Sequence, residues 1–177
     1  MSVLFGDGAG SVCLEAVESD EDVGIIASAM HTDGDSHMSI SLNLAPHCKS
    51  KWIDEGKHWP QMNGKKVFIH AVKRLPEVIN EVLQKAKMNI EDIDLFIPHQ
   101  ANQRINDHVM EKMNIPPEKM YNNISIYGNT TSATIPISLD EVLRGKCKIG
   151  TIMFMGYGSG EHWGAIIYRH IPKGVLP

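Results

Sequence analysis

The chain has 177 residues, of which 42% are hydrophobic and 21% charged, a composition typical of one globular domain with a buried core. Its formal net charge of −4 gives no electrostatic reason to expect binding to nucleic acid or to an anionic membrane. No apolar run approaches the roughly 20 residues that span a bilayer, and the N-terminus lacks the features of a signal peptide. We expect residues 1–177 to form a single domain.

The chain contains three cysteines, Cys13, Cys48 and Cys147. Their odd number and unpaired spacing argue against disulfides and against a zinc cluster. We therefore expect no bound metal, and a reducing cytoplasm as the compartment. None of the three begins a predicted helix, where the helix dipole would lower the thiol pKa. We interpret all three as structural, so the sequence offers no activated nucleophile.

The N-terminal part combines a glycine run, Gly6–Gly10, with strand-like stretches at Ser11–Val17 and Gly24–His31. A dinucleotide-binding loop requires a helix after the glycines, so that interpretation fails. Two interpretations stay open for this run and for the later one at Gly156–Gly160: the glycines let the backbone approach a substrate closely, or they only form tight turns with positive φ. Because a domain seldom opens on such a run, we expect the chain to be part of a truncated or divided larger protein.

Residues 37–63 have no clear period, and Pro46, Gly56 and Pro60 interrupt them. An irregular stretch of this length predicts a functional loop, a lid or an insertion. Just ahead of it, His31–His37 gathers possible metal ligands but lacks the ligand order of a calcium loop. We interpret that segment as a solvated turn.

The remainder alternates helices and strands. Residues 65–88 carry a broad apolar face typical of a helix, which Pro76 should bend or divide. Further along, the patterns predict a strand at 94–98, a helix at 100–113, an extended or looped segment at 121–127, a helix at 131–144, a strand at 151–155, a glycine turn at 156–160 and a strand at 163–168. This order predicts an α/β domain with a layered mixed sheet, whose last two strands form an antiparallel hairpin at the edge of the sheet.

Two polar residues stand where such folds present catalytic groups. His99 comes where the apolar strand stops and a helix begins, at the sheet edge that faces a crevice. Asn129 lies between Gly128 and Thr130, ahead of the third helix. Each has a plainer interpretation, as a structural histidine and as a turn asparagine. Together they supply the two donors that an enzyme needs to stabilise the negative oxygen of an enolate.

Four motifs carry a resemblance to a known family. They are FGDGAGS at 5–11, PHQAN at 98–102, YGNTTSA at 127–133 and GYGSGEHWG at 156–164. In this order and spacing the chain resembles the C-terminal half of the β-ketoacyl-acyl-carrier-protein synthase III family. The resemblance implies a thiolase fold, in which two similar βαβαβαββ halves pack about a pseudo-twofold axis.

The resemblance also implies roles for particular residues. His99 and Asn129 correspond to the family's catalytic histidine and asparagine, and Ser159 lies in the turn that donates a backbone N–H to a second oxyanion hole. Glycine is usual at that position, so a strained φ is a concern there. Gly64, Asn102 and Arg104 correspond to contacts of the pantetheine arm or the carrier protein.

By the same resemblance, the chain is part of an acyltransferase that condenses an acyl group from acyl-CoA with a malonyl thioester, without a cofactor. The nucleophilic cysteine belongs to the N-terminal half. A basic rim for an acidic carrier is one interpretation of four helix charges and a solvated helix face is the other; the residues are Lys65, Lys66, Lys73 and Arg74.

Two alternatives stay open. One is an acyltransferase of the same fold that does not decarboxylate its substrate, and the other is a noncatalytic interaction module. We also expect the chain alone to be inactive and to self-associate as a homo-oligomer, because a half-fold exposes the apolar face that its partner would cover.

Overall fold

A computed structural model describes residues 2–41, 55, 61–145 and 150–170 of the chain. Its main sheet has four strands in the order β1-β6-β5-β4. β4 pairs with β5 in parallel, and the other neighbours are antiparallel, so the sheet is mixed as predicted. The strands are β1 (Gly24–Thr32), β4 (Leu95–Pro98), β5 (Thr151–Gly158) and β6 (His162–Arg169), and a separate pair joins β2 (Ile40–Ser41) to β3 (Gln61–Met62).

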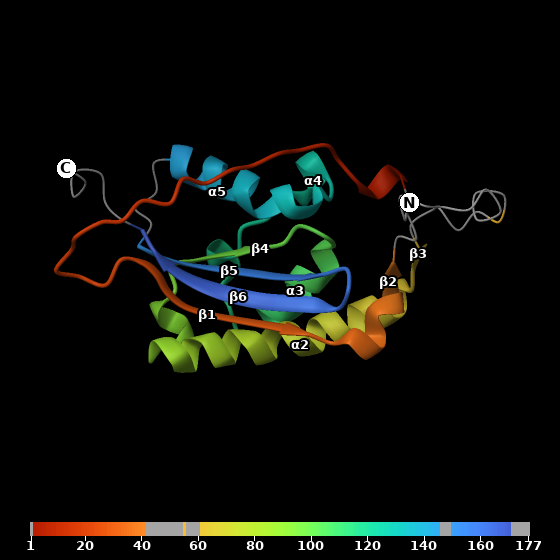
Figure 1. The fold of residues 1–177 in the computed structure, drawn as a ribbon, viewed down its shortest axis with the longest axis horizontal. Helices are drawn as coiled ribbons and strands as arrows, with labels where there is room; N and C mark the ends of the chain where they lie inside the picture. The colour runs from red at the N-terminus through yellow and green to blue at the C-terminus, as the bar shows by residue number, and fades with distance from the viewer. Residues whose placement is uncertain (1, 42–54, 56–60, 146–149, 171–177) are drawn as a thin grey trace.

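The helices cover both faces of the sheet, as Figure 1 shows. Two helices, α2 and α3, lie on one face, and α4 and α5 lie on the other, so the domain has three layers. The helices are α2 (Gly64–Ala86), α3 (Gln103–Lys112), α4 (Ile124–Tyr127) and α5 (Thr134–Arg144). Short 3₁₀ segments are η1 (Ser2–Leu4), η2 (Gly34–Ser39), η3 (Ile90–Asp92), η4 (Pro117–Lys119) and η5 (Thr131–Ala133).

The short strand β4 divides the core between the two faces. Successive side chains of a strand point to opposite faces. Phe96 accordingly joins the larger cluster under α2 and α3, together with Ile79 and Ile167. Its neighbour Ile97 joins a smaller cluster with Val142 and Ile152 on the α5 side. Because β4 is packed on both faces, its C-terminal end, which His99 follows, is held in place.

Helix α2 runs without a break through Pro76, so the prediction that this proline divides the helix is wrong. Proline lacks the N–H that would bond the carbonyl of residue i−4. Here that carbonyl belongs to Val72, and Lys112 Nζ of α3 donates to it at 3.4 Å. A side chain from the neighbouring helix therefore replaces the missing donor, and Pro76 itself is buried.

The predicted strand at Ser11–Val17 is also wrong. After a single bridge between Phe5 and Asn129, the segment up to the start of β1 has no strand. It runs along α4 and α5 (Figure 1), and helices offer no backbone ladder to pair with. The alternating apolar residues stay in solvent, with Val12 66% and Leu14 83% exposed.

Several predicted boundaries shift where caps and turns decide them. Helix α3 begins at Gln103 because Asn102 caps it. Residues 124–127, predicted as extended or looped, form the single turn α4. The predicted helix at 131–144 begins with η5. The glycine turn predicted at 156–160 shrinks to residues 159–161, because Gly156 and Gly158 pair with Gly164 and His162 in the hairpin. The predicted position of this hairpin at the sheet edge is wrong, because β1 pairs with β6 and β4 pairs with β5, which places the hairpin in the centre of the sheet.

Most of the predicted lid at 37–63 lies outside the described residues, and so do Cys48 and Cys147. Within the described part, this stretch contributes the end of η2 and the small pair β2–β3. None of the described helices combines the length and the apolar character needed to cross a bilayer.

Candidate active site

His99 lies in the loop between β4 and α3. Its backbone N–H donates to Met155 O at 2.7 Å, which continues the β4–β5 ladder by one residue. Its Nδ1 lies 2.6 Å from Thr134 Oγ1. Burial lowers the pKa of His99 below its usual value, because a desolvated imidazolium is costly. The side chain is therefore neutral at neutral pH.

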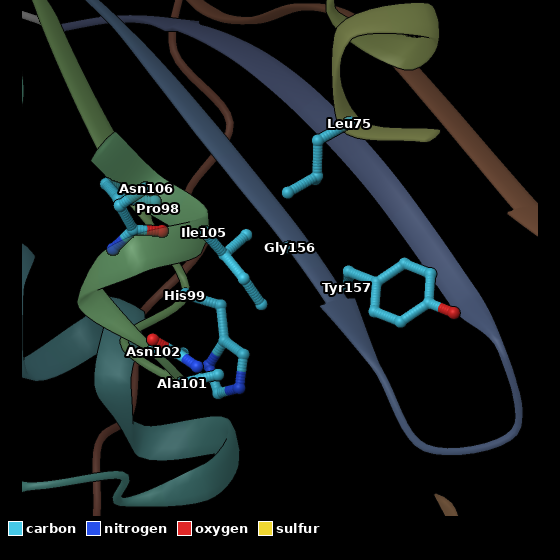
Figure 2. Close-up of a pocket in the computed structure, with 9 residues that line it drawn as sticks. All are labelled: Leu75, Pro98, His99, Ala101, Asn102, Ile105, Asn106, Gly156 and Tyr157. Carbon is cyan, nitrogen blue, oxygen red and sulfur yellow. The ribbon is translucent and has the colours of Figure 1, made fainter. Parts of the chain in front are cut away.

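A small cavity lies beside this imidazole (Figure 2), with His99 and Tyr157 on opposite sides. Leu75 of α2 and Ile105 of α3 contribute apolar wall. A Cβ at Gly156 would lie 3.4 Å from the Cβ of His99, so glycine on β5 leaves room for the histidine. The ring thus borders an apolar cavity, where hydrogen bonds are stronger than in water.

Asn129 is held by its own turn. The backbone N–H of Thr131 donates to Asn129 Oδ1 at 2.9 Å, which fixes which end of the amide is oxygen. The backbone of Asn129 exchanges hydrogen bonds with Leu4 O at 2.9 Å and Gly6 N at 3.1 Å. Among the described residues neither Asn129 Nδ2 nor His99 Nε2 has a hydrogen-bond partner, so both nitrogens are available to a ligand.

The turn formed by Thr131–Thr134 connects the two predicted catalytic residues. The backbone of Thr131 holds Asn129, while the hydroxyl of Thr134 contacts His99. Thr134 Oγ1 also lies 3.1 Å from Thr131 O. Sequence reasoning missed Thr134, because a threonine at a helix start predicts no more than a cap. Only the fold brings its hydroxyl to the histidine.

Glu141 of α5 stabilises the loop that leads to Asn129. Its carboxylate accepts hydrogen bonds from Tyr121 (2.8 Å), Asn123 (2.7 Å) and Tyr127 (2.6 Å). The Tyr127 hydrogen bond, followed by that of Asn123, lowers the pKa of Glu141. Burial, followed by the Glu141 hydrogen bond, raises the pKa of Tyr121 to about 12. No sequence pattern indicated this network, since its members are spread over 21 positions.

Gln100, the residue after His99, has a structural role. It is buried with 1% exposure, and its Nε2 donates to Pro98 O at 2.9 Å and Tyr121 O at 3.2 Å. Its Oε1 accepts from Asn123 N at 3.2 Å. A buried amide with every partner satisfied joins the end of β4 to the segment that leads to α4.

Ser159 lies in the three-residue turn between β5 and β6. The positive φ angles of this turn fall on Gly160 (80°) and Glu161 (53°), so the serine adds no strain at its own position. Its Oγ donates to Ile40 O at 3.1 Å. The turn is anchored by the carboxylate of Glu161, which is 2% exposed.

That carboxylate binds two partners. His70 Nδ1 of α2 lies 2.9 Å from Glu161 Oε2, and the hydroxyl of Tyr157 donates to the same oxygen. Glu161 Oε1 has no partner within the described chain. A buried carboxylate is held only with such partners, so His70 fixes the turn from the side of α2. Tyr157 reaches from this network to the wall of the cavity beside His99.

The predicted substrate contacts lie at two helix starts. Gly64 is the first residue of α2, and a Cβ added there would meet no atom within 4 Å. Asn102 caps α3, since its Oδ1 accepts from Arg104 N at 3.0 Å, and it lines the cavity beside His99. The guanidinium of Arg104 is exposed. The structure thus brings Asn102 close to His99.

Of the four charges considered as a basic rim, Arg74 is engaged within the fold. It lies 4.9 Å from the ring centre of Trp163 and bonds Glu77 at 3.1 Å. Lys65 and Lys73 are exposed, as expected for a solvated helix face. Arg74 is therefore held by Trp163 and Glu77, which argues against its part in a basic rim for a carrier protein.

The glycine run at the N-terminus contacts the chain itself. A Cβ at Gly6 would lie 2.0 Å from Tyr127 O, and one at Gly10 would lie 2.5 Å from the ring of Pro136. Neither glycine has a positive φ, so the tight-turn interpretation fails for this run, whereas Gly160 in the second glycine turn has a φ of 80°. Close approach explains the glycines, but the surface they approach is α4 and α5.

Residues 83–170 match the family model described as 3-Oxoacyl-[acyl-carrier-protein (ACP)] synthase III C terminal. A β-ketoacyl-[acyl-carrier-protein] synthase III from Trichodesmium erythraeum is 44% identical over 174 residues, which are 94% of this chain and 52% of the relative. The chain belongs to the β-ketoacyl-acyl-carrier-protein synthase III family. The resemblance inferred from the four sequence motifs is thereby confirmed.

Solved synthase III structures have the same fold. The chain superposes on the enzyme from Aquifex aeolicus with a TM-score of 0.74 and 37% identity, over 86% of this chain and 46% of that one. For the Thermus thermophilus enzyme the TM-score is 0.78 at 30% identity, over 96% and 53%. The thiolase-like α/β fold is confirmed, and the chain spans about half the length of the synthase III relatives it matches.

Proposed function

We propose that this chain is the C-terminal catalytic half of a 3-oxoacyl-acyl-carrier-protein synthase III-like enzyme. The observation that carries the proposal is a pair of nitrogens without a described partner, His99 Nε2 and Asn129 Nδ2. The other polar atom of each side chain, His99 Nδ1 and Asn129 Oδ1, is held by the turn at Thr131–Thr134. The relatives' names include acyl-carrier-protein synthase, and we extend their reaction to this chain. The reaction serves fatty-acid or polyketide synthesis.

In the proposed reaction a cysteine of the N-terminal half first carries the acyl group as a thioester. The bond between the malonyl carboxylate and its α-carbon then breaks, CO₂ leaves, and the electron pair forms an enolate. The enolate carbon attacks the acyl-cysteine carbonyl, a carbon–carbon bond forms, and the cysteine leaves as a thiolate. His99 and Asn129 donate to the enolate oxygen, where negative charge develops in the transition state. No cofactor or metal takes part in these steps.

Other residues support binding in this proposal. The backbone of Ser159 donates to the oxyanion formed at the acyl-cysteine. Gly64, Asn102 and Arg104 contact the pantetheine arm of CoA or of an acyl carrier protein. The chain also works with an N-terminal half and as a homo-oligomer, and alone it is inactive. We place it in the cytoplasm, although a relative from Arabidopsis thaliana is named chloroplastic.

Reconstitution tests the function. The chain is combined with an N-terminal half that carries the cysteine, assembly is verified by size-exclusion chromatography, and CO₂ release from malonyl-CoA is measured. We expect His99→Ala and Asn129→Ala each to lower the rate roughly 10²–10³-fold, as removing one oxyanion donor does elsewhere. His108→Ala, at an exposed histidine of α3, is the matched control and keeps the rate.

The outcomes separate the alternatives. An assembled pair that releases no CO₂ but transfers acyl groups from acyl-CoA supports the non-decarboxylating acyltransferase. A pair that assembles and does neither supports the interaction module. Either result rejects the proposed condensation.

A further inference from the structure

Thr134 connects the chemistry of His99 to the start of α5. A neutral imidazole carries one hydrogen, on either Nδ1 or Nε2. Burial lowers the pKa of His99, so the neutral form is the relevant one. Because Nδ1 contacts Thr134, only the form with hydrogen on Nε2 has a hydrogen to donate to a ligand. If the proposed function holds, the protein needs a device that selects this form.

The hydroxyl of Thr134 is the only described group that contacts Nδ1, at 2.6 Å. It has one hydrogen and two acceptors within reach, Nδ1 and Thr131 O at 3.1 Å. If the hydrogen goes to Thr131 O, Nδ1 must donate to Oγ1, and Nε2 is then bare. If it goes to Nδ1, the imidazole hydrogen stays on Nε2.

The backbone decides between the two arrangements. Thr131 O already accepts the backbone N–H of Thr134, so this carbonyl is satisfied without the hydroxyl. Thr134 is 3% exposed, and Nδ1 has no other donor among the described residues. The distance to Nδ1 is also shorter by 0.5 Å, the difference between 3.1 and 2.6 Å. All three observations direct the hydrogen to Nδ1.

We infer that Thr134 donates its hydroxyl hydrogen to His99 Nδ1 and thereby fixes the imidazole hydrogen on Nε2. Thr134 is then a positioning residue. The same turn orients the amide of Asn129 through the backbone N–H of Thr131. One turn at the start of α5 therefore contacts both candidate donor residues. The assignment of the two donors to an enolate rests on the proposed function, whereas the position of the hydrogen does not.

The position of the hydrogen is measured directly by two-dimensional ¹H–¹⁵N NMR of the histidine rings, on the full chain above the pKa of His99. The His99 signals are identified by their loss in His99→Gln. We expect the protonated nitrogen to be Nε2 in the unmodified chain. A hydrogen on Nδ1 in the unmodified chain overturns the inference, without any variant.

Three variants extend the test. Thr134→Val keeps the shape and removes the hydroxyl, so we expect Nδ1–H to gain population. Thr134→Ser restores the donor and the Nε2–H form. Thr130→Val is the matched control, because the buried Thr130 hydroxyl has no partner within the described chain. If Thr134→Val leaves the Nε2–H population unchanged in a chain with dispersed amide signals, the role of Thr134 is rejected.

Activity of the reconstituted pair is a separate readout. We expect Thr134→Val to lower CO₂ release by less than the roughly 10²–10³-fold that loss of a whole donor costs, and Thr134→Ser to restore it. A pair with the hydrogen on Nε2 that releases no CO₂ rejects the proposed function and leaves the tautomer assignment standing. The two failures are therefore distinguishable.

Discussion

At the scale of single residues, the candidate site depends on where hydrogens sit. His99 is desolvated, and its Nδ1 contacts a hydroxyl. Asn129 is half-buried, and its amide is oriented by a backbone N–H. Neither donor depends on a nearby charge for its orientation. A neutral pair is suited to an oxygen that becomes negative during a reaction. Neutral donors bind the uncharged ground state only weakly, so their hydrogen bonds strengthen mainly in the transition state.

The lowered pKa of His99 predicts a pH dependence of stability. In the unfolded chain the imidazole takes up its proton near the ordinary histidine pKa of about 6.5, whereas the lowered pKa of the folded chain means that it takes up the proton only at lower pH. Between these pKa values the unfolded state binds more protons, so the free energy of unfolding falls as the pH falls. Above the pKa of the unfolded chain His99 is neutral in both states, and the free energy of unfolding no longer depends on its titration.

Urea unfolding at a series of pH values below about 6.5, the ordinary histidine pKa, measures this effect. We expect the free energy of unfolding of His99→Gln to depend less on pH, in this range, than that of the unmodified chain. His108→Gln, at an exposed site, serves as the control. Parallel curves for the unmodified chain and His99→Gln would contradict the prediction.

The Glu141 network predicts an altered tyrosine titration. The chain has four tyrosines, and the pKa of Tyr121 is raised to about 12 by burial and by Glu141. The pKa of Tyr127 is raised mainly by its hydrogen bond to Glu141. Ultraviolet absorbance of tyrosinate should therefore show late-titrating groups, and Glu141→Gln should move them to lower pH. Glu118→Gln is the control, and an unchanged curve for Glu141→Gln would count against the network.

At the scale of elements, the β5–β6 hairpin is anchored to α2 through one buried carboxylate. Glu161 holds a positive φ of 53°, and its side chain reaches His70 and Tyr157. Non-glycine residues seldom adopt this conformation without compensation. The position of the turn with Ser159 therefore depends on a partner 91 residues earlier in the chain.

Removing His70 tests this anchor. His70→Ala leaves a buried carboxylate with a single partner, so we expect a loss of roughly 1–3 kcal/mol in the free energy of unfolding. Replacing the carboxylate as well, in His70→Ala with Glu161→Leu, should recover part of that loss, because no buried charge is left unpaired. A double-mutant cycle by urea unfolding measures the coupling. Additive losses would show that the pair is not coupled.

The elements also show how far sequence patterns reach. The period of α2 predicted its face and nearly its ends, yet Lys112 of another helix lets it pass through Pro76. The pattern of 11–17 is typical of a strand, but a strand forms only against another strand. Within the described chain β1 has no second neighbour besides β6, and 11–17 does not pair with it.

At the scale of the whole molecule, apolar side chains remain exposed on the segment before β1 and on β1 itself. Val3 is 93%, Leu14 83% and Met30 80% exposed. The chain also spans about half the length of its synthase III relatives. Exposed apolar groups of this kind commonly belong to an interface.

These exposures predict self-association when the chain is studied alone. We expect light scattering to give a mass above that of one chain, 19.7 kDa, at micromolar concentration, and Leu14→Lys to weaken the association. Lys73→Glu, on the exposed face of α2, is a charge-changing control that should leave it unchanged. A mass equal to one chain across the concentration range would contradict the prediction.

The sequence by itself determined the family, the α/β class, and His99 and Asn129 as candidates, because motifs and periods are local properties of the chain. It also determined the final hairpin, whose two strands are neighbours along the chain. The tertiary structure alone decided the network of Glu141, the partner of Glu161 and the contact between Thr134 and His99. Those contacts join residues 4 to 91 positions apart, and the packing of helices on the sheet is what brings such distant polar atoms within hydrogen-bond distance.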